Sequence, residues 1–182
     1  MSIWKDKRFA ICVMILMIAA GTLIGSHNSL AGKRDKAAVV FTMGVRGDGI
    51  SIQGDLRERD GAAYNMVVVA RKYLPEDNAL IQNVLIARGE LEVAATVGAK
   101  SAANRKLETA VKDLYDVLSV TELSGQDERY PRQLYTDFRS RGDSIGHDPY
   151  NQEAAAFNRV LSGFPAGLLG GLTGVKPLEL FD

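Results

Sequence analysis

The residues best suited to acid–base chemistry are a histidine and an aspartate that stand side by side. They lie in Gly146-His147-Asp148-Pro149, and an imidazole beside a carboxylate can act as a general base with its orienting partner. The same four residues are typical of a turn in which Asp148 caps the helix that follows. The turn is the preferred interpretation, and a small hydrolase that uses His147 and Asp148 is the alternative.

Metal ligands and phosphate-binding motifs are equally sparse. The chain has two histidines and one cysteine, Cys12, whereas zinc sites use clusters of these residues. The isolated acids that calcium would use lack the spacing of a calcium loop: Asp48, Asp55, Asp143 and Asp148. The glycines between residues 44 and 49 do not follow the dinucleotide-binding pattern and indicate a hinge. We therefore expect no catalytic residue, no metal site and no cofactor.

The tripeptide Arg-Gly-Asp occurs twice, at residues 46–48 and 141–143, and suggests a secreted adhesion domain. All three residue types are plentiful in this chain, so chance explains both copies better. The second copy also falls inside a predicted helix, where a protruding adhesion loop is not expected.

A long apolar run near the N-terminus precedes the part of the chain that carries these candidate residues. Residues 9–26 carry no charge and directly follow a basic flank, residues 1–8. About 20 apolar residues cross the hydrocarbon of a bilayer, so this run predicts a single transmembrane anchor in contact with lipid. The alternative is a signal peptide cleaved after Ala31, which would release a secreted domain. Basic residues flank both ends of the run, and the closer cluster favours an extracytoplasmic body.

Composition limits what the body does. Lysine and arginine number 22, aspartate and glutamate number 22, and the net charge is zero, so a nucleic-acid partner is not expected. The body must be stabilised by packing, because the only cysteine lies in the apolar run and cannot form an internal disulfide.

After a linker at residues 27–50, the apolar residues follow a helical period in four segments. The predicted stripes are Ile52, Leu56, Ala63, Val67, Ala70 and Leu74; then Leu80, Val84, Ala87, Leu91 and Ala94; then Ala103, Leu107, Ala110, Leu114 and Leu118; and finally Leu134, Phe138, Ile145, Tyr150, Ala154, Phe157 and Leu161. Asp77 and Ser101 are expected to cap the second and third helices, and Pro149 to kink or restart the last. The prediction is an all-α fold, with an up-and-down four-helix bundle at residues 51–182 and an irregular tail from residue 164 that packs across a bundle end.

Four polar residues fall near these stripes and should be paired if they are buried: Asn65, Arg141, Asn151 and Asn158. We expect Asn65 and Asn151 to pair with each other across the bundle.

Two stretches of the sequence carry a recognisable pattern. The C-terminal one contains Tyr150-Asn151, Phe157-Asn158, Phe164-Pro165, Leu168, Gly171, Gly174, Pro177 and Phe181. The other contains Ile52-Gln53, residues 55–59, Asn65, Val67-Val68 and Tyr73. Both stretches resemble the LemA family, the C-terminal one in order and spacing. The sequence departs from the pattern in lacking a proline after Ala63, in having Pro149, and in its glycine-rich segment at residues 44–49, so it resembles a divergent member.

The resemblance implies a bacterial, membrane-anchored helical bundle with no established enzymatic activity. We therefore expect a non-catalytic scaffold that binds another protein of the cell envelope. Direct binding to the bilayer through residues 164–181 is a further alternative.

Overall fold

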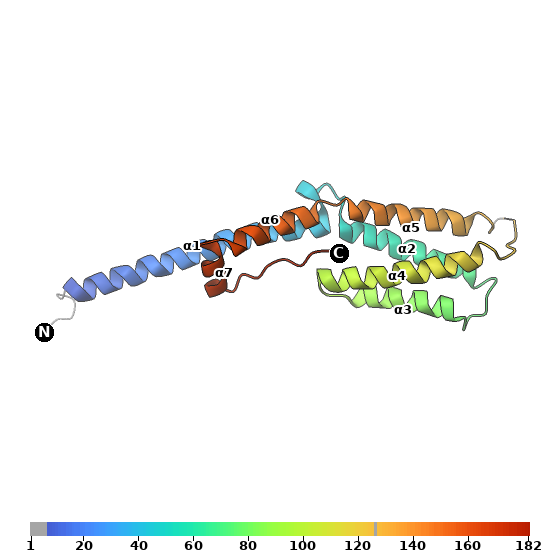
Figure 1. The fold of residues 1–182 in the computed structure, drawn as a ribbon, viewed down its shortest axis with the longest axis horizontal. Coiled ribbons are helices and arrows are strands. Elements are labelled where there is room, and N and C mark those ends of the chain that lie inside the picture. Colours follow the sequence, from blue (N-terminus) through green and yellow to red (C-terminus); the bar gives the residue numbers. More distant parts are fainter. Residues whose placement is uncertain (1–6, 126) are drawn as a thin grey trace. The chain divides into compact units, whose positions relative to one another are not determined.

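The computed structural model describes residues 7–125 and 127–182, and all regular elements in these ranges are helical (Figure 1). The α-helices are α1 (Lys7–Met43), α2 (Ile52–Ala70), α3 (Ala79–Val93), α4 (Val97–Leu118), α5 (Tyr130–Gly146), α6 (Tyr150–Ser162) and α7 (Ala166–Thr173), with a 3-10 turn, η2, at Val45–Gly47. The predicted all-α fold, with a long apolar N-terminal helix followed by a helical bundle, is confirmed.

The described residues form two compact units, which are treated separately below. The membrane unit contains residues 7–38 and 152–178, and the bundle unit contains residues 39–151 and 179–182. α1 and α6 each contribute residues to both units.

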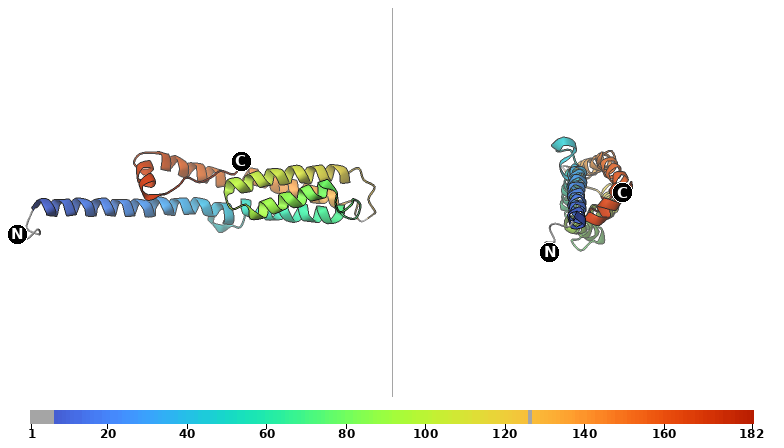
Figure 2. Two further views of the ribbon diagram at one scale, coloured as in Figure 1. Left: turned by 90° about the horizontal axis from the view of Figure 1, so that it is seen from below. Right: turned by 90° about the vertical axis from the view of Figure 1, so that its left-hand side faces the viewer.

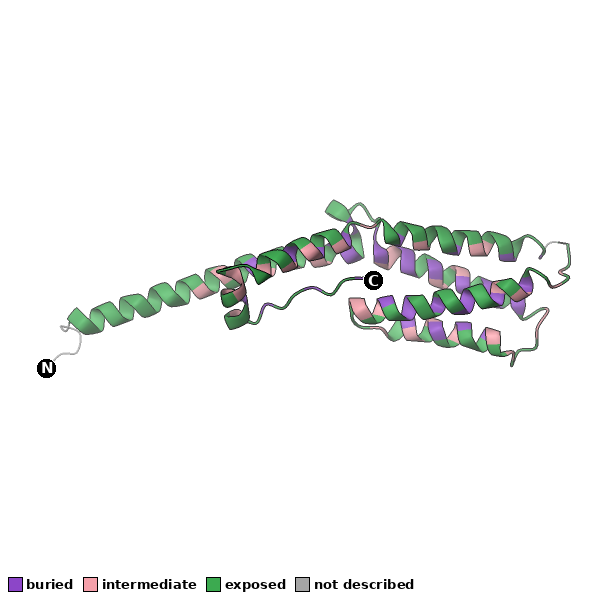
Figure 3. Cartoon of the chain, viewed as in Figure 1, coloured by how far each residue is buried: buried purple, intermediate pink, exposed green. Residues whose placement is uncertain are grey.

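The first half of α1 has the properties of a membrane-spanning helix. It includes an 18-residue window with a mean hydropathy of 2.3, none of it buried by other parts of the protein. Its large apolar side chains are exposed, among them Leu16, Met17 and Ile18 (Figure 3). Within the described residues, α1 is the one helix long and apolar enough to cross a membrane.

The stretch expected to be a linker, residues 27–50, is helical as far as Met43. It contains good helix formers and no proline or glycine between Lys33 and Met43, so nothing ends the helix before Gly44. The chain turns only over residues 44–51, where Gly44, Gly47 and Gly49 adopt positive φ angles. A Cβ atom at Gly44 would overlap the Asp48 carboxylate and the Ile50 carbonyl, so this position requires glycine.

Helices α2 to α5 form the four-helix bundle of the bundle unit (Figures 1 and 2). α2 packs against α5, α3 and α4, and α4 also packs against α3 and α5. The predicted stripes supply most of the core: the fully buried side chains include Ile52, Leu56, Val67, Val84, Leu107, Leu114, Leu118 and Phe138. Burial of these stripes is what stabilises helices that would be marginal alone.

Two predicted caps are wrong. Asn78, rather than Asp77, accepts the N-terminal hydrogen bond of α3, from the backbone N–H of Leu80 at 2.9 Å. Thr96, rather than Ser101, caps α4, and it accepts from the N–H of Ala99 at 3.2 Å. Helix α3 ends at Val93, and α4 begins at Val97, so that Gly98 lies in its first turn. Ser101 is therefore inside α4, where it is buried.

The chain restarts at Pro149, as expected, but the second part of the predicted fourth helix leaves the bundle. α5 belongs to the bundle unit, whereas α6 from Gln152 onward belongs to the membrane unit. Ala154 and Phe157 are therefore buried there, not in the bundle core.

The tail expected to be irregular contains a helix, α7, because Pro165 is followed by eight residues free of proline before Gly174 adopts the left-handed conformation that ends it. Residues 164–178 belong to the membrane unit. Residues 179–182 belong to the bundle unit.

Candidate functional site

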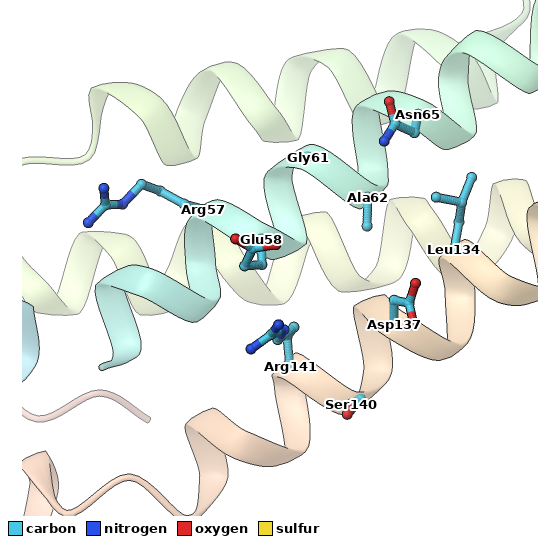
Figure 4. A pocket seen from close by; sticks show the side chains of 9 residues that line it. All are labelled: Arg57, Glu58, Gly61, Ala62, Asn65, Leu134, Asp137, Ser140 and Arg141. Carbon is cyan, nitrogen blue, oxygen red and sulfur yellow. The ribbon is translucent and has the colours of Figure 1, made fainter. Parts of the chain in front are cut away.

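The bundle carries a groove of about 770 Å³ between α2 and α5 (Figure 4). Its lining residues are Arg57, Glu58, Gly61, Ala62 and Asn65 from α2, and Leu134, Asp137, Ser140 and Arg141 from α5. On each helix they recur at intervals of three or four, which places them on a single face. The groove therefore runs along the facing surfaces of α2 and α5.

Short side chains and opposite charges characterise this groove. Gly61, Ala62 and Ser140 leave space between the helices, and a Cβ atom at Gly61 would meet no atom within 4 Å. Arg57 and Glu58 on α2 are exposed, as is Asp137 on α5. Both walls therefore offer acidic and basic groups, which suits a partner that itself carries both charges.

Arg141 links the groove to the bundle interior. Its Nη1 lies 3.2 Å from Oδ1 of Asp55, whose side chain is only 7% exposed, while the Arg141 side chain itself is 49% exposed. A buried carboxylate is costly without a partner, so Arg141 stabilises the charge of Asp55. The sequence analysis expected Arg141 to be paired if it were buried; it is paired with Asp55, but its side chain is exposed.

A buried arginine lies beside the groove residues on α2. Arg59 is 2% exposed, its guanidinium stacks 4.0 Å from the centre of the Phe138 ring, and its Nη2 lies 3.4 Å from Oε2 of Glu108. Burial lowers the pKa of Arg59, while the carboxylate of Glu108 raises it and opposes this effect. Within the described part of the chain, Arg59 Nε has no hydrogen-bond partner.

Gly142 makes room for this arginine, because a Cβ atom there would overlap the guanidinium. Sequence reasoning missed Arg59, although a signal was present. It stands three residues after Leu56 and four before Ala63, and so occupies a position on the predicted apolar stripe of α2.

The side chains of His147 and Asp148 bond to other groups and not to each other. Nδ1 of His147 lies 2.7 Å from the main-chain oxygen of Asp143, and the ring is exposed. Asp148 Oδ1 accepts a hydrogen bond of 2.8 Å from the N–H of Tyr150, the first residue of α6, so the predicted capping role is confirmed. Burial raises the pKa of Asp148, and the neighbouring charges of Asp55 and Asp48 add to this effect.

The two Arg-Gly-Asp copies lie in different settings. Residues 46–48 are exposed, with Arg46 at a positive φ angle in η2, while residues 141–143 lie inside α5, as predicted. In the second copy the glycine faces Arg59, and the arginine pairs with Asp55.

The expected pairing of Asn65 with Asn151 is wrong. Asn65 is exposed in the groove. In the bundle unit, Asn151 Nδ2 donates to the main-chain oxygen of Phe181 at 2.7 Å, and Asn151 Oδ1 accepts from the Phe181 N–H at 2.8 Å. In the membrane unit, Asn158 makes the same two bonds to Leu178, each at 2.8 Å. Both asparagines therefore bind extended main chain, which a side-chain amide matches with one donor and one acceptor.

The last four residues complete the bundle unit. Tyr150 donates from its hydroxyl to the main-chain oxygen of Glu179 at 2.7 Å, and the Phe181 ring is buried 6.1 Å from the ring centre of Phe41. The main-chain oxygen of Asp182 accepts bonds from Ser101 and Arg105 on α4.

The carboxylate of Glu179 binds the N-terminus of α4. It accepts a hydrogen bond of 2.7 Å from the N–H of Gly98, and this bond, followed by one from Thr96, lowers the pKa of Glu179. A negative charge is favourable at this end of a helix, where the N–H groups are unpaired. Ser101 lies inside α4, where its hydroxyl donates to the main-chain oxygen of Asp182.

Searches of curated proteins and of solved structures each found no match. The model of the LemA family matches residues 50–182, which covers the bundle, α6, α7 and the C-terminal segment, including both asparagines that bind main chain. The resemblance seen in the sequence is confirmed, and the chain belongs to the LemA family.

Proposed function

We propose that this protein is a membrane-anchored, non-catalytic scaffold of the bacterial cell envelope, and that its bundle binds a segment of another envelope protein. The observation that carries the proposal is the groove between α2 and α5, which is large and has acidic and basic groups on both walls. The exposed apolar half of α1 supports the anchoring.

The chemistry of the groove favours a polar peptide segment with charges of both signs. Leu134 is the one large apolar residue among those that line it, so hydrophobic burial contributes little to binding. Charge complementarity would then set which partner is accepted.

Photocrosslinking in cells that make the full-length protein tests this proposal. A photoreactive phenylalanine at Ser140, inside the groove, should give one defined adduct with an envelope protein. The same residue at Thr136, which is exposed on α5 outside the groove, is the matched control. The adduct should disappear when Arg57→Glu and Asp137→Lys reverse the charges on both walls. Identical adducts from positions 136 and 140, or an adduct that survives the charge reversal, would contradict the proposal.

We also propose that the bundle lies outside the cytoplasm, because the basic residues at positions 5–8 adjoin the apolar run more closely than those after it. Protease added to intact cells should then degrade the bundle, and mass analysis should find an intact N-terminus on the protein extracted from untreated cells. A fully protected bundle would reverse the orientation, and a mature chain that begins at Gly32 would show that the anchor is cleaved.

A further inference from the structure

The helix α7 and the turn before it expose large apolar side chains. Leu168 and Leu172, one turn apart on α7, are 60% and 67% exposed, and Phe164 in the preceding turn is 90% exposed. Residues 164–175 contain no charged side chain. Apolar side chains exposed together in this way in water would be unusual, so they require an apolar surface to cover them.

The opposite side of α7 shows where this helix lies. Gly170 is buried, and a Cβ atom there would overlap Leu161 of α6 and lie 3.7 Å from Cδ1 of Leu30 on α1. Leu30 comes four residues after Ser26, the last residue of the apolar run, which corresponds to about 6 Å along a helix. If residues 9–26 cross the hydrocarbon, α7 lies at the level of the lipid head groups.

Two further features of the membrane unit fit this level. α7 runs across the direction of α1, as both views show, so that it lies in the membrane plane when α1 spans the bilayer (Figures 1 and 2). Cationic residues also gather here: Arg34 Nε donates to the main-chain oxygen of Lys176 at 3.0 Å, and Lys33 and Lys36 are neighbours of Arg34 in the sequence. Lipid phosphates at this depth attract such charges.

We infer that α7 is an interfacial helix that inserts Leu168 and Leu172, together with Phe164 just before it, into the same bilayer that α1 spans. The inference rests on the membrane anchoring contained in the proposed function, but it needs no protein partner. Helices of this kind bury their apolar face about 5–10 Å into the boundary between head groups and acyl chains. The membrane unit is thereby held to the bilayer at two places, by α1 through it and by α7 on its surface.

The test measures the depth of single fluorescent labels on the full-length chain in vesicles of phosphatidylcholine and phosphatidylglycerol. Cys12→Ser removes the native cysteine, and an environment-sensitive label is attached to Leu168→Cys. A nitroxide at carbon 5 of the lipid acyl chain should quench this label more strongly than a nitroxide at carbon 12. The reference for water is the same label at Glu153→Cys, an exposed position on α6. A label at Leu16→Cys, in the middle of the apolar run, should show the opposite preference for the two nitroxides.

The outcomes separate the inference from the anchoring on which it rests. If the Leu16 label is quenched but the Leu168 label is quenched no more than the Glu153 label, the inference is overturned and the anchoring stands. An unquenched Leu16 label overturns the anchoring and the inference with it. Adding Leu172→Glu to the Leu168-labelled chain should abolish the quenching by the nitroxide at carbon 5. If this variant keeps the circular dichroism spectrum of its parent and the quenching persists, the inference is also overturned.

Discussion

Replacing Arg59 with alanine should lower the free energy of unfolding of the bundle by about 3 kcal/mol, the typical cost of truncating a large buried side chain. Arg59 is almost fully buried and stacks on Phe138, so the truncation leaves a cavity between α2 and α5. Arg59→Met should instead leave stability unchanged or increase it, because it fills the space without a buried charge. Denaturant unfolding of the detergent-solubilised full chain, followed by circular dichroism, measures both. Equal losses for alanine and methionine would show that the charge of Arg59, rather than its packing, stabilises the bundle.

Gly142 provides an internal control for this account. Gly142→Ala should destabilise the natural protein, because the new Cβ atom would overlap the Arg59 guanidinium. In the Arg59→Met background the same substitution should be tolerated, and the better helix propensity of alanine, worth about 1 kcal/mol, would then favour it. If Gly142→Ala has the same effect in both backgrounds, the two residues are not coupled and this explanation of the glycine fails.

Replacing Phe181 with alanine should also cost about 3 kcal/mol and release the C-terminal segment from the bundle unit. The ring is buried against Phe41, and its main chain makes two hydrogen bonds to Asn151. Amide hydrogen exchange should show the loss directly, since the Phe181 N–H is bonded in the natural protein. In a separate variant, Asn151→Leu should accelerate exchange at Phe181 by removing the acceptor.

The matched control is the preceding residue. Leu180 is 37% exposed, and Leu180→Ala should change stability by about 0.5 kcal/mol or less. Unchanged exchange at Phe181 in the Asn151→Leu variant would mean that the segment is held by other contacts.

The helices of the bundle could be predicted from the sequence because their burial follows a regular period. Leu107 and Leu114, seven residues apart, are both fully buried on α4 as the stripe required. The helix ends were harder to predict, since Thr96 and Ser101 are equally good caps by residue type. In the structure the carboxylate of Glu179 also binds the N-terminus that Thr96 caps, and Glu179 stands 81 positions after Gly98, so the local sequence does not contain this contact.

The groove and the asparagine contacts could not be predicted for a related reason. Groove residues such as Glu58 and Ser140 are polar and off the apolar stripes, so their pattern resembles any solvated helix face. Asn151 is polar on a buried face, which correctly indicated a partner, but the partner is main-chain and lies thirty positions along the chain. Pairing with backbone leaves no sequence signal at the other end, because every residue except proline offers the same two groups.

The role of residues 179–182 has a consequence for biosynthesis. A ribosome makes these residues after all four helices of the bundle, yet Phe181 covers Phe41, which belongs to the end of the first helix made. Tyr150 also packs against Phe41, but the contact with Phe181 can form only after residues 179–182 have been made. Contacts between such distant parts of a chain form slowly, and the surface of Phe41 that Phe181 covers is open to wrong partners in the interval.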